Sequence, residues 1–199
     1  MATRTDEQLL ASYREGEVDA MRQLIIRHQD DLLRFLIRLC GDRQMAEDVF
    51  QEAFLQVHIS ADTFDTSRRF KPWLFTIAAN KARDMLRKRS RRQEVDLAAP
   101  IGSSDGGGTT LIDLLEIDLP SPAQGITDRE RDDLVQRAID LMPHPLKEIL
   151  LLAYFNRLSY AQIAEELDIP LGTVKSRLHS AVATFARNWQ IVNRRDTSA

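Results

Sequence analysis

Residues 158–189 repeat their apolar positions with the period of an α-helix, and a short turn interrupts the pattern once. Ser159 is suited to cap a first helix, and Gln162 stands three residues later, as a capping box requires. The helical period then stops, because Pro170 has no amide hydrogen and Gly172 tolerates unusual backbone angles. The stretch therefore predicts two helices joined by a tight turn.

The second of these helices, which is expected to begin near Thr173, divides its side chains between two faces. Apolar residues at helical spacing are expected to face inward: Val174, Leu178, Ala181, Val182 and Phe185. Polar residues are expected to face outward: Lys175, Ser176, Arg177, His179 and Ser180. A helix with such an outer face fits the major groove of DNA, where long donors reach phosphates and base edges. The pattern favours DNA recognition over the alternative, an ordinary helical hairpin with a solvated basic face.

The rest of the chain divides into helical zones and one linker. Residues 93–125 are acidic and rich in Gly, Pro and Ser, which is typical of a linker. The zones before and after it are helical in pattern, and no run alternates as a strand does. We therefore predict an all-α protein with two small helical domains, residues 1–92 and 126–199, joined by a flexible linker. The C-terminal domain carries the helix-turn-helix.

The first domain contains a second group of polar residues with helical spacing. Thr76, Asn80, Arg83 and Arg87 line one face of a helix expected from about Phe70 to Lys88. The preceding loop, residues 58–70, carries Phe64 and Phe70. Cations and an amide beside aromatic rings are what unstacked single-stranded bases need. For Phe64 the sequence leaves core packing and base contact equally open, and for Trp73 it favours the core.

Charge is distributed unevenly along the chain. The formal net charge is −3, which is unusual for a DNA-binding protein. Residues 81–92 nevertheless hold seven basic residues and one acidic residue, whereas residues 93–133 hold ten acidic and two basic residues. We expect the free protein to bind DNA poorly, so that another component must supply affinity or rearrange the acidic segment.

The sequence indicates a cytoplasmic protein. No window is apolar for long enough to cross a bilayer, and the N-terminus lacks the pattern of a secretion signal. Cys40 is the single cysteine, so no internal disulfide is possible, and its apolar neighbours favour a packing role.

Three separated segments together resemble one known family. They are residues 46–57 (AEDVFQEAFLQV), 64–86 (FDTSRRFKPWLFTIAANKARDML) and 158–178 (LSYAQIAEELDIPLGTVKSRL). In this order, they resemble bacterial RNA polymerase sigma factors of the extracytoplasmic-function (ECF) group. Such proteins keep a promoter-melting domain that binds the −10 element and a domain that binds the −35 element. The resemblance covers nearly the whole chain except the linker and the last few residues.

The resemblance implies a role for each polar group. The exposed face of the helix after Asp42 would dock on the clamp helices of the largest polymerase subunit through Asp48, Gln51 and Glu52. The loop and the helix that follows it would capture the opened −10 strand through Phe64, Arg68, Arg69, Phe70, Thr76, Asn80, Lys81, Arg83 and Arg87. The recognition helix would contact the −35 element through Thr173, Lys175, Ser176, Arg177, His179 and Ser180. Many relatives carry Arg where this chain has Ser180, so the base preference stays open.

The partners implied by the resemblance are core RNA polymerase, promoter DNA and an anti-sigma factor, and the polymerase flap would receive the C-terminal domain. No cofactor, metal or small-molecule substrate is expected. The linker has 33 residues and, as a relaxed coil, would span only about 30 Å. The two promoter elements lie about 55 Å apart at about 3.4 Å per base pair, so the polymerase must stretch the linker. Its apolar residues 110–119 are expected to dock on a surface.

Two other function classes are weaker interpretations. An enzyme is disfavoured, because the four histidines lie in separate segments without metal-ligand spacing and no phosphate loop or nucleophile elbow is present. A stand-alone helix-turn-helix regulator would need residues 158–189 but not the loop and basic helix of residues 62–92. Binding of promoter DNA with and without core polymerase distinguishes the regulator from the sigma factor.

Overall fold

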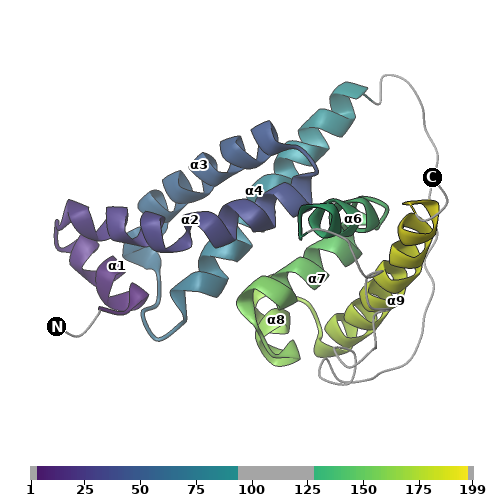
Figure 1. Cartoon of the computed structure of the whole chain (residues 1–199). Helices are drawn as coiled ribbons and strands as arrows, with labels where there is room; N and C mark the ends of the chain where they lie inside the picture. The colour runs from purple at the N-terminus through teal and green to yellow at the C-terminus, as the bar shows by residue number, and fades with distance from the viewer. Residues whose placement is uncertain (1–3, 94–127, 197–199) are drawn as a thin grey trace. The chain divides into compact units, whose positions relative to one another are not determined.

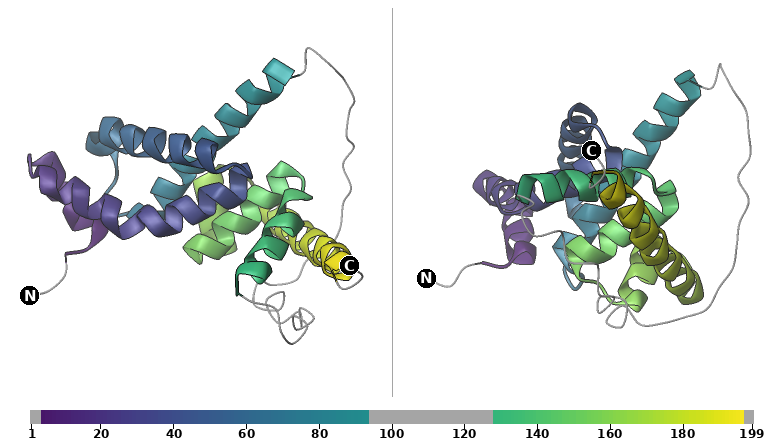
Figure 2. Two further views of the ribbon diagram at one scale, coloured as in Figure 1. Left: turned by 45° about the horizontal axis from the view of Figure 1, so that its top comes forward. Right: turned by 45° about the vertical axis from the view of Figure 1, so that its right-hand side comes forward.

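The computed structural model describes residues 4–93 and 128–196, and within these ranges the secondary structure is helical, without strands. The chain forms two compact units, one centred on α1 to α4 and the other on α6 to α9 (Figures 1 and 2). The first contains α1 (Asp6–Arg14), α2 (Val18–Cys40), α3 (Arg43–Ser60), a short 3-10 helix η1 (Ala61–Thr63) and α4 (Phe70–Gln93). The second contains α6 (Asp128–Asp140), α7 (His144–Asn156), α8 (Tyr160–Leu167) and α9 (Leu171–Asp196). The prediction of an all-α protein with two helical regions is confirmed.

Local sequence signals set the ends of the helices in the first unit. The hydroxyl of Thr5 accepts a hydrogen bond from the Gln8 amide, and the Gln8 side chain bonds back to Thr5, which completes a capping box at α1. Gly41 ends α2 in the left-handed conformation, with φ 69°. The Asp42 carboxylate then caps α3 by accepting the Met45 N–H at 2.9 Å. Gly41 and Asp42 therefore separate α2 from α3.

The first unit buries one apolar face from each of its four helices. The fully or almost fully buried residues include Leu9, Leu10, Leu24, Leu32, Leu36, Leu39, Ala46, Val49, Ala53, Val57, Leu74, Ala78 and Ala82. The rings of Phe35 and Phe75 lie 5.1 Å apart and join α2 to α4. Met45 and Phe50, which the periodicity predicts to be buried, are only partly buried. Both residues lie at the edge of the buried apolar face of α3, where the helix surface begins to face solvent.

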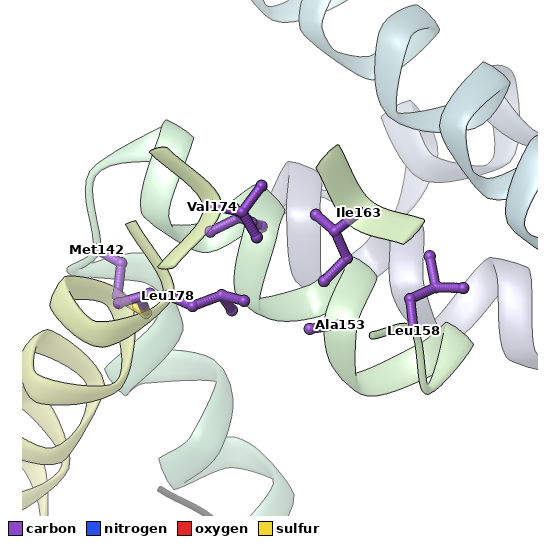
Figure 3. Packing of buried hydrophobic residues seen from close by; sticks show 8 residues of the cluster. Met142, Ala153, Leu158, Ile163, Val174 and Leu178 are labelled. Atoms are coloured by element: carbon purple, nitrogen blue, oxygen red, sulfur yellow. The ribbon is translucent and has the colours of Figure 1, made fainter. Parts of the chain in front are cut away.

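The second unit packs the helix-turn-helix around a core of α7, α8 and α9. Figure 3 shows part of this core, whose buried members are Met142, Ile149, Ala153, Leu158, Ile163, Val174, Leu178 and Ala181. Leu134 and Ala138 of α6 pack with Trp189 and Val192 near the end of α9. The inward positions of Val174, Leu178 and Ala181 are as predicted, whereas Val182 and Phe185 are only partly buried.

The turn between α8 and α9 differs from the prediction by two residues. Asp168 ends α8 in the left-handed conformation, with φ 51°, and α9 begins at Leu171, so Gly172 lies inside its first turn. The capping box of Ser159 and Gln162 at the start of α8 is present as predicted. The predicted linker falls almost wholly on residues 94–127, and its apolar segment 110–119 lies entirely among them, outside the described residues. Across the two described ranges, no helix is long and apolar enough to cross a membrane.

Candidate nucleic-acid interface

The polar face of α4 presents an amide next to cations. Arg83 donates a hydrogen bond from Nη1 to Oδ1 of Asn80 at 3.1 Å, so the NH₂ group of Asn80 is left to donate to another molecule. Asn80 and Arg87 are exposed, whereas Thr76, Lys81 and Arg83 are partly exposed. Thr76, Asn80, Arg83 and Arg87 follow one another along α4 at the steps of four, three and four residues that predict a shared face, and Lys81 is the neighbour of Asn80 in the chain. Together they form a positively charged surface with one amide donor.

The two aromatic side chains of the preceding loop pack in the core of the first unit, whereas the sequence leaves core packing and base contact equally open for Phe64. Phe64 is 6% exposed and Phe70 is fully buried. The ring of Phe64 lies 4.5 Å from Trp73 and 6.3 Å from Phe70. Trp73, predicted to be in the core, is a residue of α4 and is partly buried beside these rings. Burial in a three-ring cluster is favourable for side chains of this size, and neither phenylalanine faces solvent for a base to stack on.

The exposed part of the loop is polar and forms its own turn. Asp65 accepts hydrogen bonds from the Ser67 amide at its carboxylate, at 2.9 Å, and from the Arg68 amide at its carbonyl, at 3.0 Å. The bond from the Ser67 amide is the main reason that the pKa of Asp65 lies below its ordinary value. Arg69 is exposed and Arg68 is partly exposed. The loop therefore offers a charged turn to a ligand, with its aromatic rings folded underneath.

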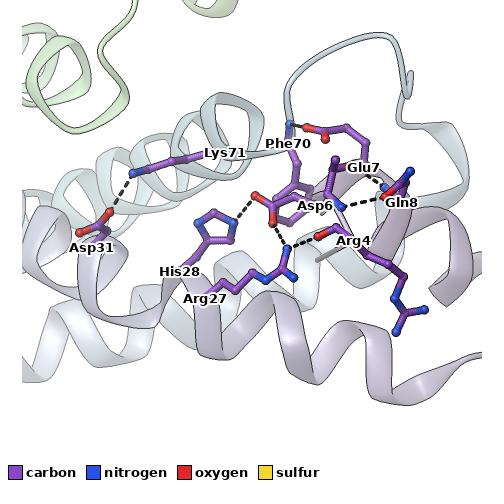
Figure 4. Close-up of polar contacts among 10 residues, drawn as sticks. Arg4, Asp6, Glu7, Gln8, Arg27, His28, Asp31, Phe70 and Lys71 are labelled. Carbon is purple, nitrogen blue, oxygen red and sulfur yellow. Dashed lines mark hydrogen bonds and ion pairs between the residues drawn. The ribbon is translucent and has the colours of Figure 1, made fainter. Parts of the chain in front are cut away.

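Helix α1 holds this loop at both ends. The guanidinium of Arg14 donates to the carbonyl of Ala61, at 2.5 Å, and to the carbonyl of Phe64. At the other end, the carboxylate of Glu7 accepts the Phe70 N–H at 2.9 Å (Figure 4). The sequence analysis missed Arg14 and Glu7, because no local pattern links them to a loop about fifty residues or more away.

Buried and half-buried ion pairs tie α1 and α4 to α2 beside the loop (Figure 4). Asp6 lies 2.7 Å from Nε2 of His28 and 3.0 Å from Arg27. Burial alone would raise the pKa of Asp6, but the hydrogen bonds from His28 and Arg27 outweigh it and the pKa is lowered. One turn further along α2, the Lys71 ammonium lies 2.8 Å from the Asp31 carboxylate.

The outer face of α3 is mixed polar and apolar. Asp48, Gln51 and Glu52 are exposed, as the helical period predicts. Leu55 and Ile59 continue the same stripe and are 51% and 65% exposed. The sequence analysis did not assign these two residues, although their positions seven and eleven residues after Asp48 place them on its face. Apolar side chains exposed beside charged ones are typical of a protein-binding surface.

The recognition helix α9 places its predicted residues at two levels of exposure. Lys175 and Arg177 are exposed, whereas Thr173, Ser176, His179 and Ser180 are partly exposed. The Ser176 hydroxyl donates to the carbonyl of Thr173 at 3.1 Å. The Nδ1 atom of His179 is buried and has no hydrogen-bond partner among the described residues. The outer edge of the His179 ring is therefore the Nε2 edge.

In the described parts of the chain, no three His, Cys, Asp or Glu residues lie close enough together to bind a metal ion.

Comparison with known proteins assigns both units. The family model for Sigma-70 region 2 matches residues 24–92, and the model for Sigma-70 region 4 matches residues 132–185. The ECF RNA polymerase sigma factor SigW of Bacillus subtilis is 31% identical over 83% of this chain and 87% of its own length. The RNA polymerase sigma-H factor of Pseudomonas aeruginosa is 32% identical over 88% of this chain and 89% of its own.

Two solved structures share the fold. The sigma factor RpoE of Bartonella quintana, solved with the anti-sigma factor NepR, aligns with a TM-score of 0.65 at 22% identity, over 87% of this chain and 99% of its own. CnrH, solved with the cytosolic domain of CnrY, aligns with a TM-score of 0.60 at 23% identity, over 92% of this chain and 95% of its own.

Proposed function

The chain belongs to the extracytoplasmic-function group of RNA polymerase sigma factors, and from this premise we propose how its surfaces divide the work of initiation. It is an alternative sigma factor. In the proposed mechanism the α1–α4 unit holds the opened −10 strand, the α6–α9 unit holds the paired −35 element, and core polymerase carries both.

Polymerase docking is assigned to the outer face of α3. Asp48, Gln51 and Glu52 would pair with polar groups on the clamp helices of the largest subunit, and Leu55 and Ile59 would be buried against them. The support is the exposure of all five side chains on one stripe of a rigid helix. The C-terminal unit would be received by the polymerase flap.

Capture of the −10 strand is assigned to the 64–69 loop and the polar face of α4. Extruding a base costs a few kcal/mol, which a protein offsets by contacts that only the unpaired base can make. Asn80 has a free amide donor beside Arg83, which suits a base edge, and Lys81 and Arg87 suit the phosphates of the strand. Phe64 and Phe70 support the loop from within the core in place of stacking on the base.

Reading of the −35 element is assigned to the first turns of α9. Because Val174, Leu178 and Ala181 are fixed in the core, the side chains between them must point outward. Lys175 would reach a base edge or phosphate, and Arg177 a phosphate. This fixed helix face, with its cations exposed and its apolar side buried, is the observation that carries the proposal.

An anti-sigma factor is the proposed regulator. Of the two aligned structures, RpoE of Bartonella quintana was solved with the anti-sigma factor NepR, and CnrH was solved with the cytosolic domain of CnrY. In the free protein the exposed Leu55 and Ile59 leave an apolar surface that a partner could cover. A partner on this face would compete directly with core polymerase.

Transcription with core polymerase tests the proposal. We expect the chain to shift promoter DNA only when core polymerase is present, and run-off transcripts to start at positions that depend on the chain. Lys175→Ala should weaken initial binding, whereas Asn80→Ala should leave it unchanged and lower the permanganate reactivity of −10 thymines. A tight specific shift by the chain alone would instead support a stand-alone regulator.

A further inference from the structure

Helix α1 makes three contacts with the segment that leads into and out of the 64–69 loop. Tyr13 bonds through its hydroxyl to Nδ1 of His58, at 2.5 Å, just before η1. Arg14 donates to two carbonyls three residues apart, those of Ala61 and Phe64. Glu7 accepts the first amide of α4, that of Phe70. These contacts join residues 45 to 63 positions apart, so they fix the loop from outside its own sequence.

The middle of the loop is exposed and is built on the turn at Asp65. The carboxylate of Asp65 accepts the Ser67 amide and its carbonyl accepts the Arg68 amide, and the side chains of residues 65–67 and 69 are exposed. Phe64 and Phe70 anchor its two ends in the core. A short exposed loop that must order itself on a ligand loses affinity, whereas one that is held beforehand does not.

We propose that α1 is the positioning element for −10 strand capture, with Arg14 and Glu7 as its positioning residues. Arg14 fixes the entry of the loop and Glu7 fixes its exit, so that the charged turn between them is presented in one conformation. The inference rests on the proposed function of the loop and adds residues of α1, which precedes the region that the Sigma-70 region 2 model matches.

The chemistry of the two side chains suits this task. The planar guanidinium of Arg14 bonds to both carbonyls at once through Nε and Nη2, which a lysine ammonium cannot do in the same fixed geometry. The carboxylate of Glu7 satisfies an amide at the start of α4 that has no partner within the helix, and its negative charge is favourable there. A glutamine at position 7 would keep the accepting oxygen and lose only the charge.

The experiment compares matched variants of the full chain bound to core polymerase. Arg14→Met and Glu7→Met remove the two contacts and keep the aliphatic stems, and Glu7→Gln is the conservative rescue. Arg4→Met is the control within the N-terminal segment, since Arg4 pairs with Glu17 at 2.6 Å and contacts no part of the loop. Leu39→Ala is the stability control, because it opens a cavity near the end of α2.

Two affinities are measured for each variant: that for a single-stranded −10 oligonucleotide and that for a duplex carrying only the −35 element. Removing either contact should weaken strand binding about tenfold, equivalent to about 1.4 kcal/mol, with −35 binding unchanged. Glu7→Gln, Arg4→Met and Leu39→Ala should bind the strand like the wild type at a temperature where all variants are folded.

The inference is overturned if the two methionine variants bind the strand as tightly as the wild type. It is equally overturned if Glu7→Gln loses as much as Glu7→Met, or if Leu39→Ala loses as much as Arg14→Met, since the effect would then be one of charge or stability. If the wild-type holoenzyme itself has no affinity for the −10 strand, the proposed function of the loop fails together with the inference.

Discussion

The exposed leucine and isoleucine on α3 allow a quantitative prediction of polymerase binding. Leu55 and Ile59 share a stripe with Asp48, Gln51 and Glu52, and both are unusually exposed for their type. The double variant Leu55→Ala/Ile59→Ala removes most of this apolar surface and leaves every charge in place. It therefore isolates the apolar part of the proposed docking surface.

The magnitude follows from how much of each side chain remains to be buried. Complete burial of a Leu or Ile side chain contributes about 1.5–3 kcal/mol. Leu55 is 51% exposed and Ile59 is 65% exposed in the free protein, so docking has about 1 kcal/mol to gain from the first and about 1.5 kcal/mol from the second. Because alanine keeps one methyl group, we expect a loss of about 2 kcal/mol for the pair, which is about a thirtyfold rise in Kd.

The assay is competition between each variant and labelled wild-type protein for core polymerase. Val18→Ala/Ile26→Ala is the matched control, since these α2 residues are 76% and 55% exposed and belong to no proposed surface. Both double variants should unfold within about 0.5 kcal/mol of the wild type, because the changed side chains are exposed. The reasoning is refuted if the α3 variant competes as well as the wild type, or if the α2 control loses as much.

Three further predictions concern single residues. The Nδ1 atom of His179 is buried, so any contact with a base must come from Nε2. His179→Gln should therefore keep the −35 sequence preference of the holoenzyme, and His179→Asn should lose it. Binding to promoters with single base substitutions measures this preference, and a preference kept by the Asn variant and lost by the Gln variant would contradict the prediction. The hydrogen bond from the Lys71 ammonium holds the pKa of the Asp31 carboxylate below its ordinary value of 3.8. The stability that this ion pair contributes is therefore present above pH 3.8 and is lost as the pH falls through the lower pKa that Asp31 has in the folded protein. Asp31→Asn should accordingly show a shallower loss of stability in urea unfolding below pH 4, and superimposable pH curves would argue against the pairing. Leu178 is fully buried, so Leu178→Ala should cost about 3 kcal/mol, measured by Trp189 fluorescence in a Trp73→Phe background; a loss below about 1 kcal/mol would mean that the core position is wrong.

The parts of the fold that the sequence predicts well depend on neighbours along the chain. The capping box of Ser159 and Gln162 is formed as predicted, and the helix break at Gly41 and Asp42 depends on signals of the same local kind. Each involves backbone groups within four residues, and the helical period is likewise local. Leu55 could have been recognised as exposed in the same way, because it falls outside the buried stripe of α3.

The parts that the sequence does not predict depend on contacts between distant segments. Phe64 lies in a short loop without a period, and only its contact with Trp73 decides between core packing and exposure. Glu7 meets the amide of Phe70 across 63 residues, and no pattern in either segment indicates that pair. The hold of α1 on the loop could therefore be found only in three dimensions.

The distribution of exposed cations explains why such a chain should need a larger partner to hold DNA. On the recognition face of α9, residues 173–180, Lys175 and Arg177 are exposed cations. Two phosphate contacts give a salt dependence with a slope of only about −2, far from the strong electrostatic binding of a protein that neutralises many phosphates. On α4, Arg89 is already paired with Asp42 at 3.3 Å, which further reduces the free positive charge. The surface is therefore better suited to choosing among DNA sequences than to retaining DNA, and that division favours a sigma factor over a stand-alone regulator.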